Sequence, residues 1–158
     1  MKPLLPGTCL IAALMLTACG GSPPPAPAAI AADSGEAMAT IGDVTIRASA
    51  LQTSSLNEAI ARRYDIARDD RTVMLLVAVR KGQGTAETSV PARVTASATG
   101  LTGGRRDIPM REQRTGELLD YVGTVDTTLP ETLRFEVDVV REDGARSTLR
   151  FNREFFAR

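Results

Sequence analysis

The sequence predicts an immunoglobulin-like antiparallel β-sandwich of about seven strands with one short helix. Three observations predict this fold: short segments in which apolar and polar residues alternate, glycine-containing turns between them, and a C-terminal pair of segments whose apolar faces match across a tight turn. A small barrel is the alternative arrangement of the same strands. The sequence has no Trp, so the Cys and Trp core of antibody domains is not expected.

The first predicted elements are a strand at 43–51 and a helix at 55–64. The strand segment alternates small or apolar residues with polar ones at period two. Ser55 and Glu58 have the spacing of a capping box, which predicts the start of the helix. Glu58 and Arg62 are spaced to pair on its exposed side. The apolar residues of the helix share one face: Leu56, Ala59, Ile60 and Tyr64.

Residues 73–79 are seven consecutive apolar residues and predict a central strand. Because neighbouring side chains of a strand point to opposite faces, both faces of this strand must be kept from water. In a sandwich, one face packs on the opposite sheet. We therefore expect the helix at 55–64 to cover the other face with Leu56 and Ile60.

Three further strands are predicted at 90–99, 105–112 and 117–125. They are separated by glycine-containing segments at 100–104 and 115–116, which are typical of hairpin turns.

The last two strands form a hairpin whose register the sequence predicts. The apolar residues that share one face of each strand occupy odd positions, and only a three-residue loop, Glu142–Gly144, keeps both sets on the same side of the hairpin. The loop glycine is expected in the left-handed conformation. This register places Phe135 opposite Phe151 and Glu136 opposite Arg150. The odd-numbered apolar set comprises Leu133, Phe135, Val137, Val139, Leu149, Phe151 and Phe155.

Residues 1–18 have the pattern of a secretory signal, in which Lys2 precedes an apolar run from Leu4 to Leu16. The segment that ends in Leu-Thr-Ala-Cys resembles the bacterial lipobox, so Cys19 is expected to carry lipid. Gly20 follows the cysteine, which by resemblance to sorted lipoproteins favours the outer membrane. The alternative is an ordinary secretory signal with a coincidental cysteine.

Residues 19–37 are expected to be the lipidated cysteine and a Pro/Ala-rich linker, and residues 38–158 the folded domain. The linker has no periodic apolar face, and its prolines favour an extended spacer of about 3 Å per residue. Cys9 lies in the signal segment and Cys19 is expected to bear lipid. The domain should therefore fold without a disulfide.

Scattered residues of the folded part carry a family resemblance: Gly42–Val44, Ala50–Leu51, Leu56, Ile60–Ala61, Tyr64–Ile66, Val94–Ala96, Arg111–Glu112, Tyr121–Gly123, Thr132–Phe135 and Phe155–Phe156. Together they resemble DUF4426, a family of bacterial exported domains without assigned function. The resemblance covers about residues 40–158. It implies no catalytic residues.

Composition excludes several function classes. The 158 residues include 19 Lys and Arg, 19 Asp and Glu, and no His, which excludes Ser-His-Asp catalysis and His-ligated metals. The balanced charge lacks the basic excess that nucleic-acid binding needs. We predict no catalytic residue, no cofactor and no metal site.

Several groups of residues are candidates for chemistry. Gly82–Gly84 is a candidate phosphate loop, but we favour a loop tip. Two carboxylate pairs are candidates for calcium binding or acid-base work, but we favour solvated turns: Asp69–Asp70 and Glu142–Asp143.

Two arginine pairs are candidates for binding lipid phosphate or glycan carboxylate, but we favour ordinary surface residues: Arg62–Arg63 and Arg105–Arg106. The tyrosines Tyr64 and Tyr121 are candidate ligand-binding residues, but we favour anchors at the edge of the core.

Two function hypotheses remain. The first is a non-catalytic interaction or structural module, tethered to the outer membrane through Cys19 and facing the periplasm, that offers a sheet edge or loop face to an envelope protein. The alternative is a small-ligand or glycan-binding domain with a pocket between the sheets or under the helix. An unpaired edge would favour the first, and a deep pocket lined by Arg plus Tyr the second.

Overall fold

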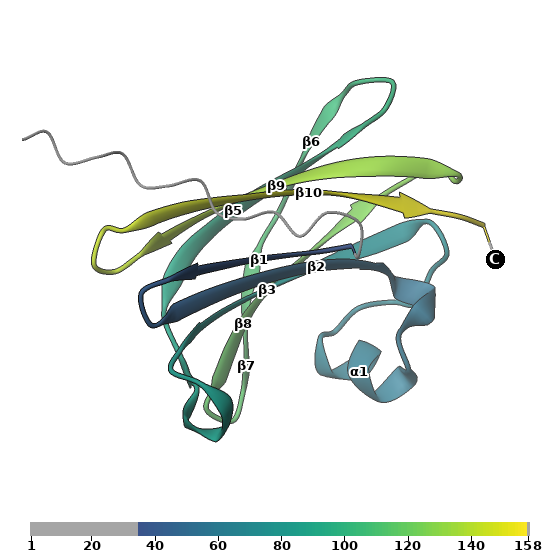
Figure 1. Cartoon of the computed structure of the whole chain (residues 1–158). Coiled ribbons are helices and arrows are strands. Elements are labelled where there is room, and N and C mark those ends of the chain that lie inside the picture. The colour runs from purple at the N-terminus through teal and green to yellow at the C-terminus, as the bar shows by residue number, and fades with distance from the viewer. Residues whose placement is uncertain (1–34, 158) are drawn as a thin grey trace, which may run out of the picture.

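The computed structural model describes residues 35–157, which form two antiparallel β-sheets packed face to face (Figure 1). The six-stranded sheet contains β1 (Glu36–Ile41), β2 (Val44–Gln52), β3 (Thr72–Lys81), β4 (Thr88–Ser89), β7 (Arg111–Thr115) and β8 (Leu118–Asp126). The four-stranded sheet contains β5 (Ala92–Gly100), β6 (Arg105–Ile108), β9 (Glu131–Arg141) and β10 (Arg146–Phe155). The connections hold the α-helix α1 (Glu58–Arg63) and the short 3-10 helices η1 (Thr53–Ser55) and η2 (Gly84–Ala86).

The strand order is that of an immunoglobulin-like sandwich, which confirms the predicted fold class. The first sheet runs β1-β2-β3-β8-β7, and β2-β3-β8-β7 corresponds to A-B-E-D of the immunoglobulin fold. The second sheet runs β10-β9-β5-β6, which corresponds to G-F-C with one added strand. Strand β1 extends the first sheet beyond its A position, and the short β4 pairs with β3.

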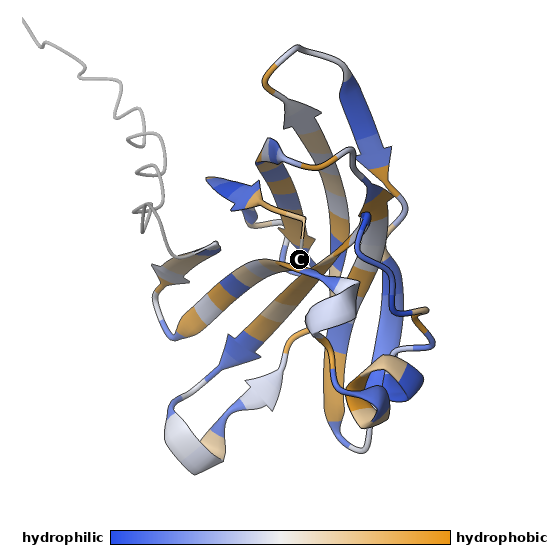
Figure 2. Cartoon of the chain, turned by 90° about the vertical axis from the view of Figure 1, so that its right-hand side faces the viewer, coloured by the Kyte–Doolittle hydropathy of each residue, from blue (hydrophilic) through white to orange (hydrophobic). Residues whose placement is uncertain are grey.

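The core lies between the sheets and follows from the alternation along each strand. Figure 2 shows hydrophobic and hydrophilic bands alternating along the strands. The predicted register of the last hairpin is confirmed: Phe135 pairs with Phe151, Glu136 pairs with Arg150, and Gly144 has a φ of 80°. The two phenylalanine rings stack with centroids 5.0 Å apart.

Helix α1 covers the outer face of β3, as predicted. Leu56 and Ala61 are buried in a second apolar cluster with Met74 of β3 and Val122 of β8. Ile60 packs against this cluster. The cluster keeps water from the row of β3 side chains that points away from the main core.

The start of the helix differs from the prediction. Asn57 is the N-cap, and its Oδ1 accepts a hydrogen bond from the Ile60 amide at 2.9 Å. Ser55 instead ends the 3-10 helix η1, so the expected capping box with Glu58 does not form. Asn is as good an N-cap as Ser, and Asn57 directly precedes Glu58, the first residue of the helix. The predicted pair of Glu58 and Arg62 is present at 3.2 Å.

The structure also corrects the number of strands: residues 35–157 form ten where about seven were expected. The single strand predicted at 105–112 is two strands, β6 and β7, which belong to different sheets. Pro109 lies between them and cannot donate a ladder hydrogen bond, so the chain leaves one sheet there and joins the other at Arg111. A Cβ at Gly123 would lie 2.7 Å from the Pro109 carbonyl oxygen, so this glycine lets the crossing chain pack against β8.

Candidate functional site

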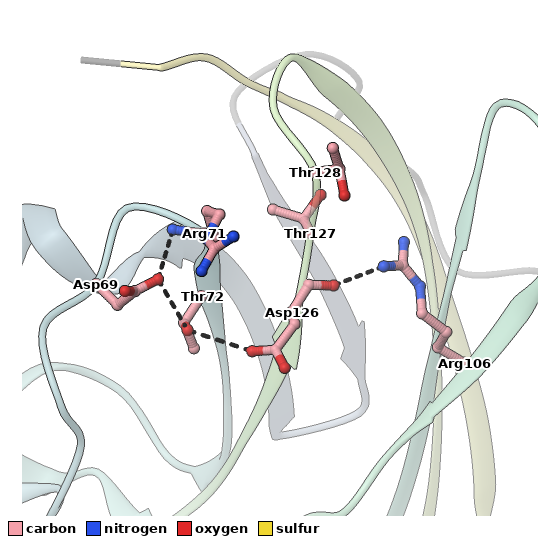
Figure 3. A pocket seen from close by; sticks show the side chains of 7 residues that line it. All are labelled: Asp69, Arg71, Thr72, Arg106, Asp126, Thr127 and Thr128. Carbon is pink, nitrogen blue, oxygen red and sulfur yellow. Dashed lines mark hydrogen bonds between the residues drawn. The ribbon is translucent and has the colours of Figure 1, made fainter.

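A polar pocket of about 480 Å³ lies where β6 of one sheet approaches the start of β3 and the end of β8 of the other (Figure 3). Its lining comes from three segments: Asp69, Arg71 and Thr72; Asp126, Thr127 and Thr128; and Arg106. We call this cavity the end pocket. No sequence pattern joins these segments, because they come together only through the strand order.

The Thr72 hydroxyl lies between the two aspartates of the end pocket and can donate its one proton to either of them. Thr72 Oγ1 lies 3.3 Å from Oδ1 of both Asp69 and Asp126. Asp69 Oδ1 also accepts the Arg71 amide at 2.7 Å, a local turn that Asp favours. All these bonds use Oδ1, so the second oxygen of each carboxylate remains available to accept another hydrogen bond.

Arg106 joins the two sheets at the end pocket. Its Nη1 donates to the Asp126 carbonyl at 2.5 Å, and its Nη2 lies 3.3 Å from Glu131 Oε2. Thr127 Oγ1 donates to the same Glu131 oxygen at 2.5 Å. Partial burial raises the pKa of Glu131, but the Thr127 hydrogen bond and the Arg106 charge outweigh it, so the pKa lies below its ordinary value. The Glu131 carboxylate thus neutralises the Arg106 charge.

Gly100 makes room for this arrangement at the end of β5. A Cβ on this residue would overlap Glu131 Oε1. The glycine therefore allows Glu131 to reach Arg106 and Thr127.

A second polar cluster is buried on the outer face of the six-stranded sheet. Arg80 and Asp120 form an ion pair, and each residue is less than 9% exposed. Arg80 Nη1 also donates to the Leu119 carbonyl at 2.8 Å. Tyr64, at the C-terminal end of α1, donates its hydroxyl to Asp120 Oδ2 at 3.2 Å. Burial and the Asp120 charge both raise the pKa of Tyr64. This cluster fixes the end of α1 to the sheet.

The sheet edges differ in how well they are protected from pairing with another chain. Besides the two-residue β4, the edge strands are β1, β6, β7 and β10. Charged residues occur on three of them: Arg105, Arg106 and Asp107 on β6; Arg111, Glu112 and Arg114 on β7; Arg146, Arg150, Arg153 and Glu154 on β10. Strand β1 has one charged residue, Glu36 at its start, and exposes Met38 and Ile41 by 49% and 41%. Since charges on an edge oppose strand pairing, β1 is the least protected edge of the described residues.

Comparison with protein families gives one match. The family model described as "Domain of unknown function (DUF4426)" matches residues 38–158. The chain belongs to this family. The crystal structure of a DUF4426 family protein from Pseudomonas aeruginosa PAO1 is similar, with 24% sequence identity, a TM-score of 0.65, and coverage of 78% of this chain and 97% of that one. That likeness supports the DUF4426 fold. Among curated proteins, none matches the chain.

The DUF4426 domain brings some of the predicted candidate residues into the end pocket and leaves their neighbours outside. Asp69 lines the pocket, whereas the Asp70 carbonyl accepts a hydrogen bond from Gln52 Nε2 at 2.9 Å. Arg106 lines it, whereas Arg105 lies on the outer face of its sheet, 3.4 Å from Glu136. Arg105 and Arg106 are divided because adjacent residues of a strand point in opposite directions. Asp69 and Asp70 are divided by the turn that precedes β3.

The remaining candidates have structural roles in the DUF4426 domain. Asp143 Oδ1 accepts the Ala145 amide at 2.9 Å within the β9–β10 turn. Tyr121 accepts the Ala92 amide at 2.7 Å, and burial raises its pKa. The Gly82–Gly84 segment leads into η2, a 3-10 helix of three residues. Among residues 35–157, no cluster of three His, Cys, Asp or Glu residues could hold a metal ion.

The predicted signal segment, Cys19 and most of the predicted linker lie outside the described residues. Within residues 35–157, no helix is long and apolar enough to cross a membrane.

Proposed function

We propose that this DUF4426 protein is a cell-envelope lipoprotein: a non-catalytic interaction or structural module, tethered to the outer membrane and facing the periplasm. The lipobox-like segment that ends in Cys19, the Gly20 that follows it and the Pro/Ala-rich linker support the tether. The sandwich is the part that meets a partner.

The observation that carries this proposal is the unprotected edge of β1. The backbone of β1 pairs with β2 along one side only. Although β1 approaches β10, no backbone hydrogen bond among the described residues joins these two strands. The N–H and C=O groups on the free side therefore have no backbone partner among the described residues, which is the condition for pairing with an added strand.

The partner that fits this edge is an extended segment of an envelope protein. Backbone hydrogen bonds to β1 would supply affinity, and contacts with the exposed Met38 and Ile41 would supply apolar area. A segment with alternating apolar residues matches this surface best, because the buried Ala37 and Ala39 alternate with exposed side chains along β1.

Site-specific photo-crosslinking in intact cells tests the proposal. A photoreactive residue at position 40, on the exposed side of β1, should give a discrete adduct with an envelope protein. The same residue at position 112, on the charged edge β7, is the matched control and should give none. Met38→Glu adds a charge to the β1 edge and lies opposite Arg47, so the domain should fold while the position-40 adduct is lost.

Three results would contradict the proposed partner. One is equal crosslinking from positions 40 and 112. Another is an adduct that survives Met38→Glu. The third is an adduct of twice the mass of the chain, which would identify the occupant of the edge as a second copy of the same protein.

A further inference from the structure

The end pocket holds charges of both signs that its internal bonds leave unused. Oδ2 of Asp69 and Oδ2 of Asp126 take no part in the hydrogen bonds that fix these carboxylates. The Arg71 guanidinium forms no ion pair with a described residue. Because Glu131 neutralises Arg106, the pocket offers two carboxylate oxygens and one guanidinium to a ligand.

This set of groups selects the charge of the ligand. A simple anion would be attracted by Arg71 but repelled by the two carboxylates. A simple cation would be attracted by the carboxylates but repelled by Arg71. A molecule that carries both an ammonium and a carboxylate group satisfies all three. We propose that the end pocket binds a small zwitterion, such as a free amino acid or a dipeptide, with its carboxylate on Arg71 and its ammonium on Asp69 and Asp126.

The size and rigidity of the pocket fit this ligand. About 480 Å³ is within the usual range for small-molecule sites, and larger than one amino acid requires. The backbone of the walls and the two aspartates are held before a ligand arrives: Thr72 contacts both aspartates, Arg106 binds the Asp126 carbonyl, and the Thr127 amide donates to the Arg71 carbonyl at 2.7 Å. Holding these parts in advance reduces the conformational entropy lost on binding, and only the Arg71 side chain has to be ordered by the ligand.

Two-dimensional amide NMR of the full chain, titrated with three probes, tests the inference. Glycylglycine is the zwitterion, methylammonium chloride supplies the ammonium alone, and sodium acetate supplies the carboxylate alone. Glycylglycine should shift the amides of residues 71–72 and 126–128 in a saturable way. Each single-charge probe should bind about ten-fold more weakly or worse, because it loses one charge-assisted contact. Glycine in a fourth titration distinguishes a free amino acid from a dipeptide.

Variants assign the two halves of the site. Arg71→Gln and Asp126→Asn should each weaken glycylglycine binding about ten-fold, since each removes one charge and keeps the side-chain size. Asp70→Asn is the matched control, because Asp70 is adjacent in sequence but does not line the pocket, and it should bind normally. The inference is overturned if glycylglycine gives no saturable shift, if acetate binds as tightly, or if Arg71→Gln binds normally. These outcomes leave the β1 edge untouched, so this inference and the proposed function fail separately.

Discussion

Phe135 and Phe151 are the aromatic centre of the sandwich core. They are 0% and 4% exposed, and their rings stack on each other. The Phe155 ring meets Phe135 edge-on, with the two centroids 6.4 Å apart. Residues 35–157 contain no cysteine and so no disulfide, and apolar burial of this kind is a main favourable contribution to the free energy of folding. A change at either ring should therefore lower the free energy of unfolding of the whole domain.

Replacing Phe135 or Phe151 with Ala should destabilise the domain by about 3 to 5 kcal/mol, since each change leaves a cavity in a close-packed core. Denaturant unfolding measures the effect. Phe156→Ala, at a side chain that is 59% exposed, is the control and should change stability by less than about 0.5 kcal/mol. If both core variants melted within a degree or two of the parent, the two rings would not pack as described.

Glu136 makes the stability of the domain depend on pH. The hydrogen bond from Arg150 at 2.7 Å is the main cause that holds the pKa of Glu136 below its ordinary value. Between the unfolded pKa of about 4.3 and the lower folded pKa, the unfolded state binds more protons. This contribution to stability is therefore complete above the unfolded pKa and is lost as the pH falls through the folded pKa.

Glu136→Gln should accordingly make the stability of the domain depend less on pH in the acid range. Melting temperatures of parent and variant, measured from about pH 6 to pH 3, should converge as the pH falls, because protonation of Glu136 removes the same interaction. Glu154→Gln is the control on the same sheet, at an exposed carboxylate without a described ion pair. Parallel curves for parent and Glu136→Gln would show that the ion pair with Arg150 contributes nothing.

Individual residues differ in how far the sequence predicts their contacts. The pairing of Phe135 with Phe151 was predictable because it depends on the parity of two adjacent strands and one turn. The pairing of Arg80 with Asp120 was not, because it depends on β8 lying beside β3. The available signal was that Arg80 follows the apolar run 73–79 and that Asp120 interrupts the apolar run 118–122. These two charges indicate a buried ion pair only once the strand order is known.

At the scale of elements, the sequence predicts strands with strong alternation and misses those without it. Strand β1 contains four small or polar residues and is followed by the two-residue turn Gly42–Asp43, where Gly42 has a φ of 64°. That Gly-Asp turn was the available hairpin signal. The break at Pro109 was also readable from proline chemistry, but the change of sheet that follows was not.

The end pocket was only partly predictable from the sequence, because its lining comes from three separate segments of the chain. Asp69 and Arg106 were candidates in the sequence, each beside a neighbour of the same charge. Arg71, Asp126 and Thr128 were not, because nothing in their local sequence distinguishes them from surface residues. Only the packing of β6 against the ends of β3 and β8 brings these side chains together.

Helix α1, with Leu56 just before it, covers apolar residues on the outer face of the six-stranded sheet. Leu56→Ser with Ile60→Ser keeps Asn57 as the N-cap but removes the cover from Met74 and Val122. Burial of a large apolar side chain is worth roughly 1.5 to 3 kcal/mol, so the double variant should be less stable, bind a hydrophobic dye and associate. Dye fluorescence and sedimentation measure this outcome.

Arg62→Ser with Arg63→Ser is the matched control for that experiment, since both residues belong to the exposed part of the same helix. It should remain monomeric and silent to the dye. A Leu56 and Ile60 double variant that stayed monomeric, dye-silent and as stable as the parent would show that α1 is peripheral to the fold.

At the scale of the whole molecule, the described domain begins where the predicted tether would join it. Gly35 accepts a hydrogen bond from the Ala50 amide at 3.1 Å, so the chain is fixed to β2 immediately before β1 begins. Strand β1, which has the unprotected edge, is therefore the described strand nearest in sequence to the proposed anchor at Cys19. Lipid attachment and edge pairing would then both involve the N-terminal part of the chain. Cys19→Ala removes the first and Met38→Glu the second.

Cys19→Ala should abolish lipid labelling and membrane-linked processing, because a thioether to diacylglycerol requires the cysteine sulfur at the processing site. Incorporation of radiolabelled palmitate and the mass of the chain, which shows whether the signal segment has been removed, measure the two effects. Cys9→Ala is the matched control, because that cysteine lies within the predicted signal segment, and it should be labelled and processed as the parent is. Unchanged palmitate incorporation in Cys19→Ala would overturn the proposed anchor. The sandwich itself should keep its melting temperature in this variant, since Cys19 lies 17 positions before Glu36, where β1 begins.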